Sequence, residues 1–229
     1  MGIRDAGDPV ELAARYDAAG ADELVLLDIT ATSSERNTAV ELAAKVAAEV
    51  FIPFTIGGGI RSVDDSQAVL DAGADKVAVN SAAVARPELI GELSERFGAQ
   101  CVVLAIDAKT NTSGDGWEVY VAGGRKATGV DLVEWAKAGV GFGAGEILLT
   151  SMDRDGTRDG YDIAMLDAVC TAVSVPVIAS GGAGVLEDVA DALRGPSDAA
   201  LLASLLHDGD TTVEELRKSL IAAGISVKP

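Results

Sequence analysis

The sequence is poor in aromatic and basic residues, and each shortage excludes a class of structure or function. Aromatic residues make up only 4% of the 229 residues, so the core has to be built from Val, Ile, Leu and Ala. Lys and Arg number 18 against 36 Asp and Glu, and the net charge of −18 argues against a nucleic-acid or anionic-membrane surface. A small phosphorylated ligand is not excluded, because backbone N–H groups bind phosphate locally.

Cysteine and histidine are also scarce. Cys101 and Cys170 lie in apolar runs without a CxxC partner, which predicts buried, reduced thiols rather than a disulfide. His207, the single histidine, is interpreted as a structural or rim residue rather than a catalyst. No Ser-His-Asp spacing, zinc motif or dinucleotide fingerprint occurs, so we predict no metal and no cofactor. No signal-peptide pattern and no apolar run of about 18 residues is visible, and we therefore expect a cytoplasmic protein.

Short apolar runs alternate with amphipathic stretches along the whole chain, which predicts parallel strands joined by right-handed helical crossovers. The predicted strands span residues 24–28, 54–58, 76–80, 101–107, 146–150, 176–180 and 198–203. The predicted helices span residues 10–19, 38–50, 64–72, 87–97, 130–139, 163–173, 187–194 and 212–223. We therefore expect one domain over residues 1–229, an α/β fold of the TIM-type (βα)8 barrel class.

Local signals support several of these boundaries. Asp8 followed by Pro9 and Glu11 predicts a capped helix start, and Gly20, Gly73 and Gly98 suit the left-handed position that ends a helix. One long insertion, residues 109–128, separates a strand from the next helix, and its residues 117–121 alternate like part of a small hairpin. The insertion lies at the carboxyl end of a strand, so we expect it to be a lid or a substrate loop.

The sequence repeats itself at an offset of about 123 residues. LVLLDIT at residues 24–30 resembles EILLTSM at 146–152, Ile56-Gly57-Gly58 resembles Ser180-Gly181-Gly182, and Asn80-Ser81 resembles Ala203-Ser204. Two half-barrels of four βα units each explain this repeat. The strand that ends at Asp107 would then have its counterpart before Met1. We therefore expect a barrel that lacks its first strand, with seven strands and eight helices.

Polar residues and glycines gather at the predicted carboxyl ends of the strands, which form the active face of such barrels. Residues 57–59 and 181–184 are glycine-rich, and glycine lets the backbone N–H groups approach a phosphate closely. A single glycine-rich turn is more often just a tight connection. Two of them at equivalent places in the repeat predict a ligand with a phosphate at each end.

Asp107 ends the apolar strand CVVLAID. A carboxylate at this position is either a hydrogen-bond acceptor towards a helix or a general acid/base. The loop from Asp153 to Thr157 has the composition of an Asx-turn network that only shapes the rim, and it contains Asp155 as a further candidate. The residues alone leave both alternatives open.

Longer motifs resemble the cyclase-subunit family of imidazole glycerol phosphate synthase over nearly the whole chain. They include GADELVLLDIT, IPFTIGGGIRSV, GADKVAVNSAAV, AIDAK, GWEVYVAGGRKATG and VPVIASGGAG. The resemblance implies a (βα)8 barrel that converts a phosphoribulosyl aminoimidazole-carboxamide ribonucleotide and ammonia. The products would be imidazole glycerol phosphate and an aminoimidazole carboxamide ribotide. It also implies a glutaminase subunit as partner and no cofactor.

The resemblance assigns roles to positions that match the family's motifs. These are catalysis at Asp107; one phosphate site at Gly59, Asn80 and Ser81; another at Gly182, Ala203 and Ser204, with Asp155 and Gly156 nearby; pocket lining by Thr150 and Ser180; and a gate for ammonia, on the face where the glutaminase docks, at Glu23, Lys76 and Glu146.

The chain departs from the family pattern mainly at its start. The family's other catalytic aspartate, a following loop with a lysine, and an arginine of the gate belong to the first strand, which we expect to be absent. Val121 and Ala122 also replace a polar pair that includes a histidine. An exposed sheet edge favours self-association. The leading hypothesis is therefore an impaired cyclase, and two alternatives are kept. One is a non-catalytic or engineered barrel fragment that only binds phosphorylated ligands, and the other is a sugar-phosphate isomerase of the same pathway.

Overall fold

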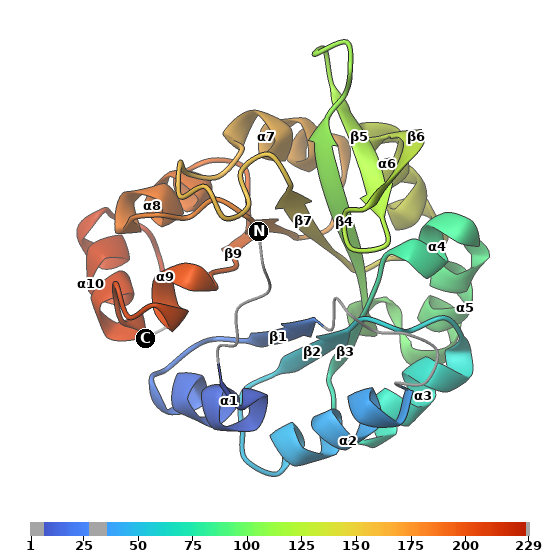
Figure 1. Ribbon diagram of the computed structural model, residues 1–229, viewed down its shortest axis with the longest axis horizontal. Coiled ribbons are helices and arrows are strands. Elements are labelled where there is room, and N and C mark those ends of the chain that lie inside the picture. Colours follow the sequence, from blue (N-terminus) through green and yellow to red (C-terminus); the bar gives the residue numbers. More distant parts are fainter. Residues whose placement is uncertain (1–6, 28–35, 228–229) are drawn as a thin grey trace.

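The computed structural model describes residues 7–27 and 36–227 as a curled sheet with helices on its outer face (Figure 1). Parallel strands follow the order β1-β2-β3-β4-β7-β8-β9, which confirms the predicted alternation. Their bounds are β1 (Leu24–Leu27), β2 (Phe54–Gly57), β3 (Lys76–Val79), β4 (Val102–Thr110), β7 (Glu146–Ser151), β8 (Val177–Ser180) and β9 (Ala199–Ala200). The strand predicted over 198–203 is thus shorter than expected, and Asp28, the predicted end of β1, lies outside the described residues.

The helices connect the strands and number more than the eight that were predicted. Within the described ranges they are α1 (Pro9–Ala18), α2 (Arg36–Ala47), α3 (Val63–Asp71), α4 (Ser81–Ala85), α5 (Glu88–Phe97), the 3₁₀ helix η1 (Ala99–Cys101), α6 (Leu132–Phe142), α7 (Ile163–Ala172), α8 (Leu186–Arg194), α9 (Ser204–His207) and α10 (Val213–Ala222). The short helices α4 and α9 were missed because four or five residues carry no readable helical period.

The capping signals at the ends of the first helices are confirmed, with one exception at Gly98. The Asp8 carboxylate accepts hydrogen bonds from the N–H groups of Val10 and Glu11, at 2.8 and 3.2 Å, so it satisfies donors that a helix start leaves unpaired. Gly20 and Gly73 follow their helices with φ values of 86° and 114°, which other residues rarely adopt. Gly98 is itself the cap residue of α5, and its φ of 90° with ψ of 146° is not the left-handed helical conformation that was predicted.

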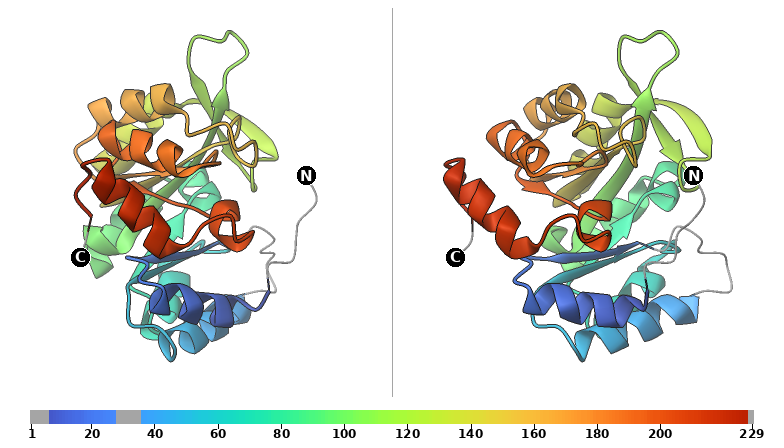
Figure 2. Two further views of the ribbon diagram at one scale, coloured as in Figure 1. Left: turned by 90° about the vertical axis from the view of Figure 1, so that its left-hand side faces the viewer. Right: turned by 60° about the vertical axis from the view of Figure 1, so that its left-hand side comes forward.

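The insertion after Asp107 forms an antiparallel extension of the sheet. β4 continues three residues beyond the predicted end, to Thr110, and pairs with β5 (Trp117–Val121), which pairs with β6 (Lys126–Asp131). The predicted hairpin is therefore continuous with β4 and projects from the sheet (Figures 1 and 2). Because β6 takes residues 126–131, the helix predicted over 130–139 begins later, at Leu132, with Asp131 as its cap.

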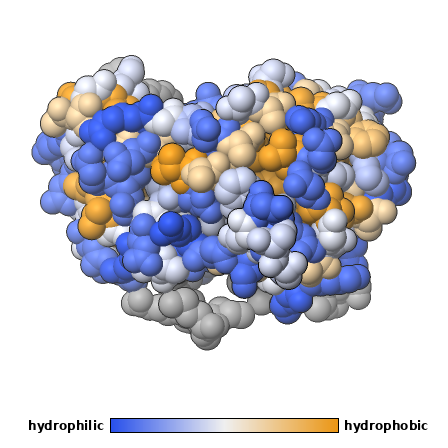
Figure 3. All heavy atoms as spheres, turned by 90° about the horizontal axis from the view of Figure 1, so that it is seen from above, coloured by the Kyte–Doolittle hydropathy of each residue, from blue (hydrophilic) through white to orange (hydrophobic). Residues whose placement is uncertain are grey.

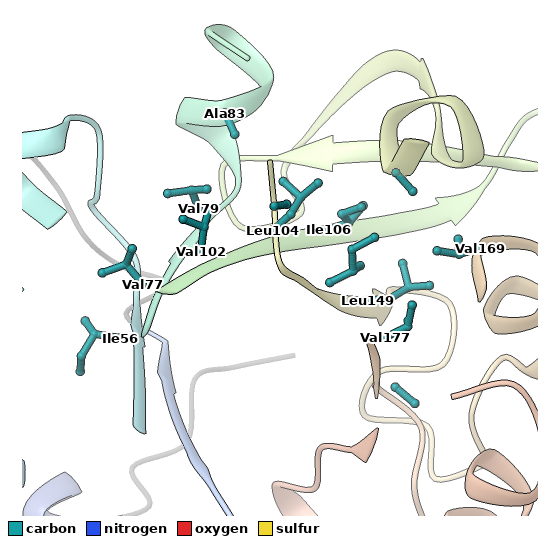
Figure 4. Packing of buried hydrophobic residues seen from close by; sticks show 14 of the residues in the cluster. Ile56, Val77, Val79, Ala83, Val102, Leu104, Ile106, Leu149, Val169 and Val177 are labelled. Carbon is teal, nitrogen blue, oxygen red and sulfur yellow. The ribbon is translucent and has the colours of Figure 1, made fainter. Parts of the chain in front are cut away.

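Two apolar clusters hold the fold together. The larger lies between the strands and the helices, and Figure 4 shows part of it, including Ile56, Leu104 and Leu149, which alternate with inward-facing residues on their strands. The smaller cluster comes from the other side of the same strands. It is formed by Ala78, Val103 and Leu148, with Val25, Ala105, Ile178 and Leu201 packed against it. Apolar side chains from β1, β3, β4, β7 and β8 therefore pack on the inner side of the curled sheet.

The ends of the sheet, β1 and β9, do not pair with each other in the part of the chain that is described. Side chains connect them instead. The Arg217 guanidinium on α10 donates to the Gly20 carbonyl oxygen and to Asp22, at 2.6 and 2.7 Å, and Figure 2 shows α10 beside the segment that joins α1 to β1. The Tyr16 hydroxyl and His207 Nδ1 are 2.7 Å apart. The two ends are thus joined by contacts between residues that are more than 190 positions apart.

Several backbone contacts recur at a shift of 123 residues. Asp75 Oδ2 accepts from the Phe54 N–H at 2.9 Å, and Asp198 Oδ2 accepts from the Val177 N–H at 2.9 Å. Asn80 and Ala203 adopt nearly equal, unusual backbone angles, φ −130°, ψ −89° and φ −126°, ψ −80°. The sequence repeat therefore corresponds to a repeat of local geometry.

The surface seen from above is mostly hydrophilic, with separate hydrophobic patches between charged regions (Figure 3). Among the helices built from residues 7–27 and 36–227, none has the length and apolar character needed to cross a membrane.

Candidate active site

Asp107 lies near the carboxyl end of the parallel part of β4. It alternates with Ile106 and Ala108, which are fully buried on the helix side, so its side chain faces the interior of the curl. In register, Asp107 is opposite Thr150 of β7, and Thr150 is opposite Ser180 of β8. The pairing brings three predicted site residues into one row across adjacent strands.

Asp107 has one hydrogen-bond donor in the described structure, Asn80. The Asn80 amide donates to Asp107 Oδ2 at 3.0 Å. Desolvation by burial raises the pKa of Asp107 to about 6, the negative charge of Asp155 adds to this rise, and the Asn80 hydrogen bond opposes it. A carboxyl group with a pKa near the working pH exchanges protons readily in both directions, which is what general acid/base catalysis needs.

Asn80 has a second feature of a binding residue. Its Oδ1 atom is buried and has no hydrogen-bond partner among the described residues. An unpaired buried acceptor costs about 1–3 kcal/mol, so a bound ligand that donates an N–H or O–H there recovers this free energy.

The first glycine-rich turn follows β2. Gly58 and Gly59 have φ values of 99° and 72°, and the chain then passes to α3, whose first turn is capped by Ser62. At the end of the next strand, the Ser81 hydroxyl accepts from the Ala122 N–H at 2.9 Å. The hairpin between β5 and β6 therefore contacts the predicted phosphate residue Ser81, and Ala122 itself has a positive φ of 58°.

The second glycine-rich turn follows β8 and is packed from both sides. Gly181 and Gly182 have φ values of 85° and 116°, and Gly182 accepts from the Gly160 N–H at 2.9 Å. A Cβ atom at Gly182 would collide with the Gly160 carbonyl oxygen, and one at Gly181 would meet Asp155 at 3.2 Å. The glycines are required for this close approach.

The loop that contains Asp155 and Gly156 is shaped by its own hydrogen bonds. The Asp155 N–H donates to the Ser151 carbonyl oxygen at 2.8 Å, and the Thr157 hydroxyl donates to the Arg154 carbonyl oxygen at 2.7 Å. Asp153 accepts from the Thr110 N–H at 2.8 Å and so connects this loop to the extension of β4. The sequence left a rim network open as one of two alternatives and gave no sign of this tether.

Three charged residues meet at the opposite end of the strands. Lys76 Nζ lies 2.9 Å from Glu23 and 2.8 Å from Glu146, and the Lys76 side chain is only 19% exposed. Burial disfavours the charged lysine, but the hydrogen bonds and charges of Glu146 and Glu23 outweigh it and raise the pKa of Lys76. The predicted gate residues are thus in contact, and they are remote from the row of Asp107.

Some contacts of the site region carried no sequence signal. Arg158, which has a positive φ of 66°, is paired with Asp208 at 2.7 Å and with Asp210 at 2.9 Å, so it connects the Asp155 loop to the chain after α9. Ala203, the cap residue of α9, and Ser204, its first residue, are the two residues of the predicted second phosphate site that lie at this helix. Residues 7–27 and 36–227 contain no group of three or more His, Cys, Asp or Glu positioned for a metal ion.

These features define an α/β sheet protein with a largely buried carboxyl group of raised pKa, placed between two glycine-rich turns at the carboxyl ends of parallel strands. The chain belongs to the histidine biosynthesis protein family, whose model matches residues 2–212. It is 59% identical over 235 residues to the imidazole glycerol phosphate synthase subunit HisF of Synechococcus sp. (strain CC9902), covering 100% of this chain and 91% of that relative.

Two further relatives carry the same description. The identity is 57% over 234 residues for the protein of Synechococcus sp. (strain CC9605), with 100% of this chain and 91% of the relative covered. It is 58% over 234 residues for that of Synechococcus sp. (strain CC9311), with 100% and 89% covered. This chain is shorter than these relatives.

Proposed function

We propose that this chain is a cytoplasmic cyclase of histidine biosynthesis, of the imidazole glycerol phosphate synthase type. It would form imidazole glycerol phosphate and an aminoimidazole carboxamide ribotide from a phosphoribulosyl precursor and ammonia. The observation that carries the proposal is Asp107, an inward-facing carboxyl group with a pKa of about 6, between two glycine-rich turns. The identity of 57–59% to three HisF subunits supports it.

The two ends of the substrate have separate partners. One phosphate would be held by the turn at Gly59 with Asn80 and Ser81, and the other by Gly182 with Ala203 and Ser204, Asp155 and Gly156 lying nearby. Thr150 and Ser180 would line the space between them, in the row of Asp107. Backbone N–H groups at such turns suit phosphate, because their partial positive charge offsets the chain's overall negative charge locally.

Asp107 would transfer protons to and from the reacting centre of the substrate. Near neutral pH a carboxyl group with a pKa of about 6 is mostly ionised and acts as a base, and its protonated form is still accessible as an acid. Asn80 would orient it through the 3.0 Å hydrogen bond and would offer its unpaired Oδ1 atom to a substrate donor. No metal and no cofactor is needed for these steps.

We also propose that the fold derives from a (βα)8 barrel made of two half-barrels. The recurring contacts at a shift of 123 residues support this origin. In that arrangement β4 joins β3 to β7, and the equivalent strand would join β9 to β1, where the described residues contain none.

Ammonia would enter from the end of the strands opposite to Asp107. Glu23, Lys76 and Glu146 form a charged cluster there, and a glutaminase subunit docked over it would deliver ammonia into the interior of the curl. The partner is inferred from the relatives, whose description names one subunit of a synthase.

A second candidate function is binding without turnover. The open sheet between β9 and β1 favours it, since a catalytic group from a strand at that place would be missing.

One experiment separates the two functions. Turnover of the phosphoribulosyl substrate with saturating ammonium is measured for the chain, for Asp107→Asn and for the matched control Asp75→Asn, whose carboxylate lies before β3. A cyclase predicts turnover that falls by about 10²–10⁴-fold in Asp107→Asn and little in the control. Substrate binding without any turnover in the unaltered chain would instead establish the binding protein. Equal turnover in all three proteins would contradict the role of Asp107.

A further inference from the structure

A cavity of about 410 Å³ lies beside the edge of β1 that pairs with no strand of residues 7–27 and 36–227. All four β1 residues line it, α1 and α2 cover it, and His207 of α9 lies at its other side. The lining is largely apolar, and it is not part of the row that contains Asp107. Of the glycine-rich turn at residues 57–59 only Gly57 lines it, so the proposed phosphate sites account for little of this space.

The internal sequence repeat shows what occupies the equivalent space in the second half of the chain. Shifted by 123 residues, the four α1 residues that line the cavity, Pro9, Leu12, Ala13 and Tyr16, correspond to Leu132, Trp135, Ala136 and Gly139 of α6. All four α6 residues are buried. At Gly139 a Cβ atom would collide with the side chain of Leu104, so this face of α6 packs on β4. The equivalent face of α1 borders the cavity, whereas this face of α6 is covered by β4.

The backbone of β1 offers a matching set of hydrogen-bond groups. The Leu24 N–H donates to the Pro53 carbonyl oxygen, so Leu24 and Leu26 face β2. Val25 and Leu27 consequently direct their N–H and C=O groups to the other edge, which no described strand covers. In β7 the equivalent residues, Leu148 and Thr150, face β4.

The packing of side chains also indicates that this edge of β1 lacks the neighbour that β7 has. Leu148 is 1% exposed and belongs to the inner cluster, next to Val103 of β4. Its counterpart Val25 is only partly buried, and Leu27 is 45% exposed. Both residues lack the apolar neighbour that β4 provides in the second half.

We propose that the cavity accepts one extended apolar strand, which pairs in parallel with β1 and has the residue pattern of β4. A strand fits the place better than a folded second copy does, because the space is covered by α1 and its partner has to reach beneath that helix. A second copy would also bring a further charge of −18 to the same edge. The inference concerns the fold and does not depend on the proposed activity.

Entry of a strand would disturb one contact that can be observed. Tyr16 stands where α6 has Gly139, so its ring takes up part of the space above the edge of β1, and its hydroxyl lies 2.7 Å from His207 Nδ1. A bound strand requires Tyr16 to move away from His207. His207 is the single histidine of the sequence, so its ring resonances report on this site without ambiguity.

The test uses a synthetic peptide that copies residues 101–110 with Cys101→Ser. A control peptide carries in addition Leu104→Pro and Ile106→Pro, which remove two backbone donors. Binding to the full chain is measured by calorimetry, by the His207 resonances and by amide hydrogen exchange. The cavity variant Ala13→Phe is compared with Ala18→Phe, an exposed position on the same helix.

We expect one peptide per chain, slower exchange of the Val25 and Leu27 amides, and a shift of the His207 resonances. The proline peptide and Ala13→Phe should each weaken binding by about tenfold or more, and Ala18→Phe should not change it. If Ala13→Phe fails to fold, the comparison of the two peptides on the unaltered chain still tests the proposal. No saturable binding below about 1 mM, or equal binding of both peptides, would overturn the proposal. Protection of the Val25 and Leu27 amides by dimerisation, without peptide, would overturn it too.

Discussion

The stretch from α1 to α4 and the stretch from α6 to α9 use the same order of elements, but their first strands differ in burial. Val25 of β1 is only half-buried, whereas Leu148 at the same place in β7 is 1% exposed. Their local hydrogen bonds are alike, as the matched bonds of Asp75 and Asp198 illustrate. Local sequence therefore determines the local geometry of a βα unit, and the neighbouring strand determines how well its core is packed.

The largest change in the free energy of unfolding is expected at a position where the two halves of the chain have different residues. Gly184 corresponds to Arg61, and a Cβ atom at Gly184 would collide with the Arg158 carbonyl oxygen. Gly184→Ala should therefore lower the free energy of unfolding by about 3 kcal/mol. Arg61 is exposed, so Arg61→Ala should change it by less than about 0.5 kcal/mol. Urea unfolding of both variants measures the difference, and equal losses would contradict the packing described for the second half.

Asp107 should destabilise the fold when it is ionised. Its pKa is raised to about 6 in the folded state, so its contribution to stability is present below the unfolded pKa of about 4 and is lost as the pH rises through 6. Asp107→Asn should thus be more stable than the parent chain by about 2–3 kcal/mol at pH 7, a gain that disappears near pH 4. Unfolding curves at the two pH values test this. A pH-independent difference would show that Asp107 has an ordinary pKa.

The equivalent hydrogen bonds of Asp75 and Asp198 should contribute equally to the free energy of unfolding. Asp75→Ala and Asp198→Ala each leave one strand-initiating N–H group, that of Phe54 or Val177, without its acceptor. Each substitution should cost about 1.5 kcal/mol. The midpoints of urea unfolding should then shift by similar amounts in the two variants. A loss confined to one of them would mean that the two halves are not equivalent at this contact.

The smallest effect is expected for Lys76, which pairs with Glu23 and Glu146, two glutamates that correspond to each other in the repeat. Lys76→Met should cost about 1 kcal/mol, a modest value because Glu23 is half exposed and solvent weakens its attraction. The loss should shrink in high salt, which screens the repulsion left between the glutamates. Unfolding experiments at low and high ionic strength measure this loss of stability. A loss that grows with salt would contradict the electrostatic explanation.

Much of the fold was predictable because the relevant signals are local. The Asp8 cap, the glycines that end helices and the apolar runs of β2, β3 and β7 all lie within a few residues of the elements that they define. The extension of β4 to Thr110 was missed, because its pairing with β5 depends on a partner strand rather than on apolar periodicity.

The candidate site was predictable in part for the same reason. The position of Asp107 at the end of an apolar strand indicated an active-face carboxylate. Its hydrogen bond with Asn80, 27 residues away, and the charge of Asp155 depend on which strands are neighbours. The contact of Tyr16 with His207 joins the two ends of the sheet, and no pattern in the sequence indicated it.

Amide hydrogen exchange tests the central comparison most directly. In the chain alone, the N–H groups of Val25 and Leu27 should exchange on the order of 10²-fold faster than those of Leu148 and Thr150. Within the part of the chain that the structure describes, only the latter pair faces a neighbouring strand on that side. Leu24 and Leu26, which face β2, provide the internal control. Equal protection of Val25, Leu27, Leu148 and Thr150 would contradict the account, because it would mean that the edge of β1 is already covered.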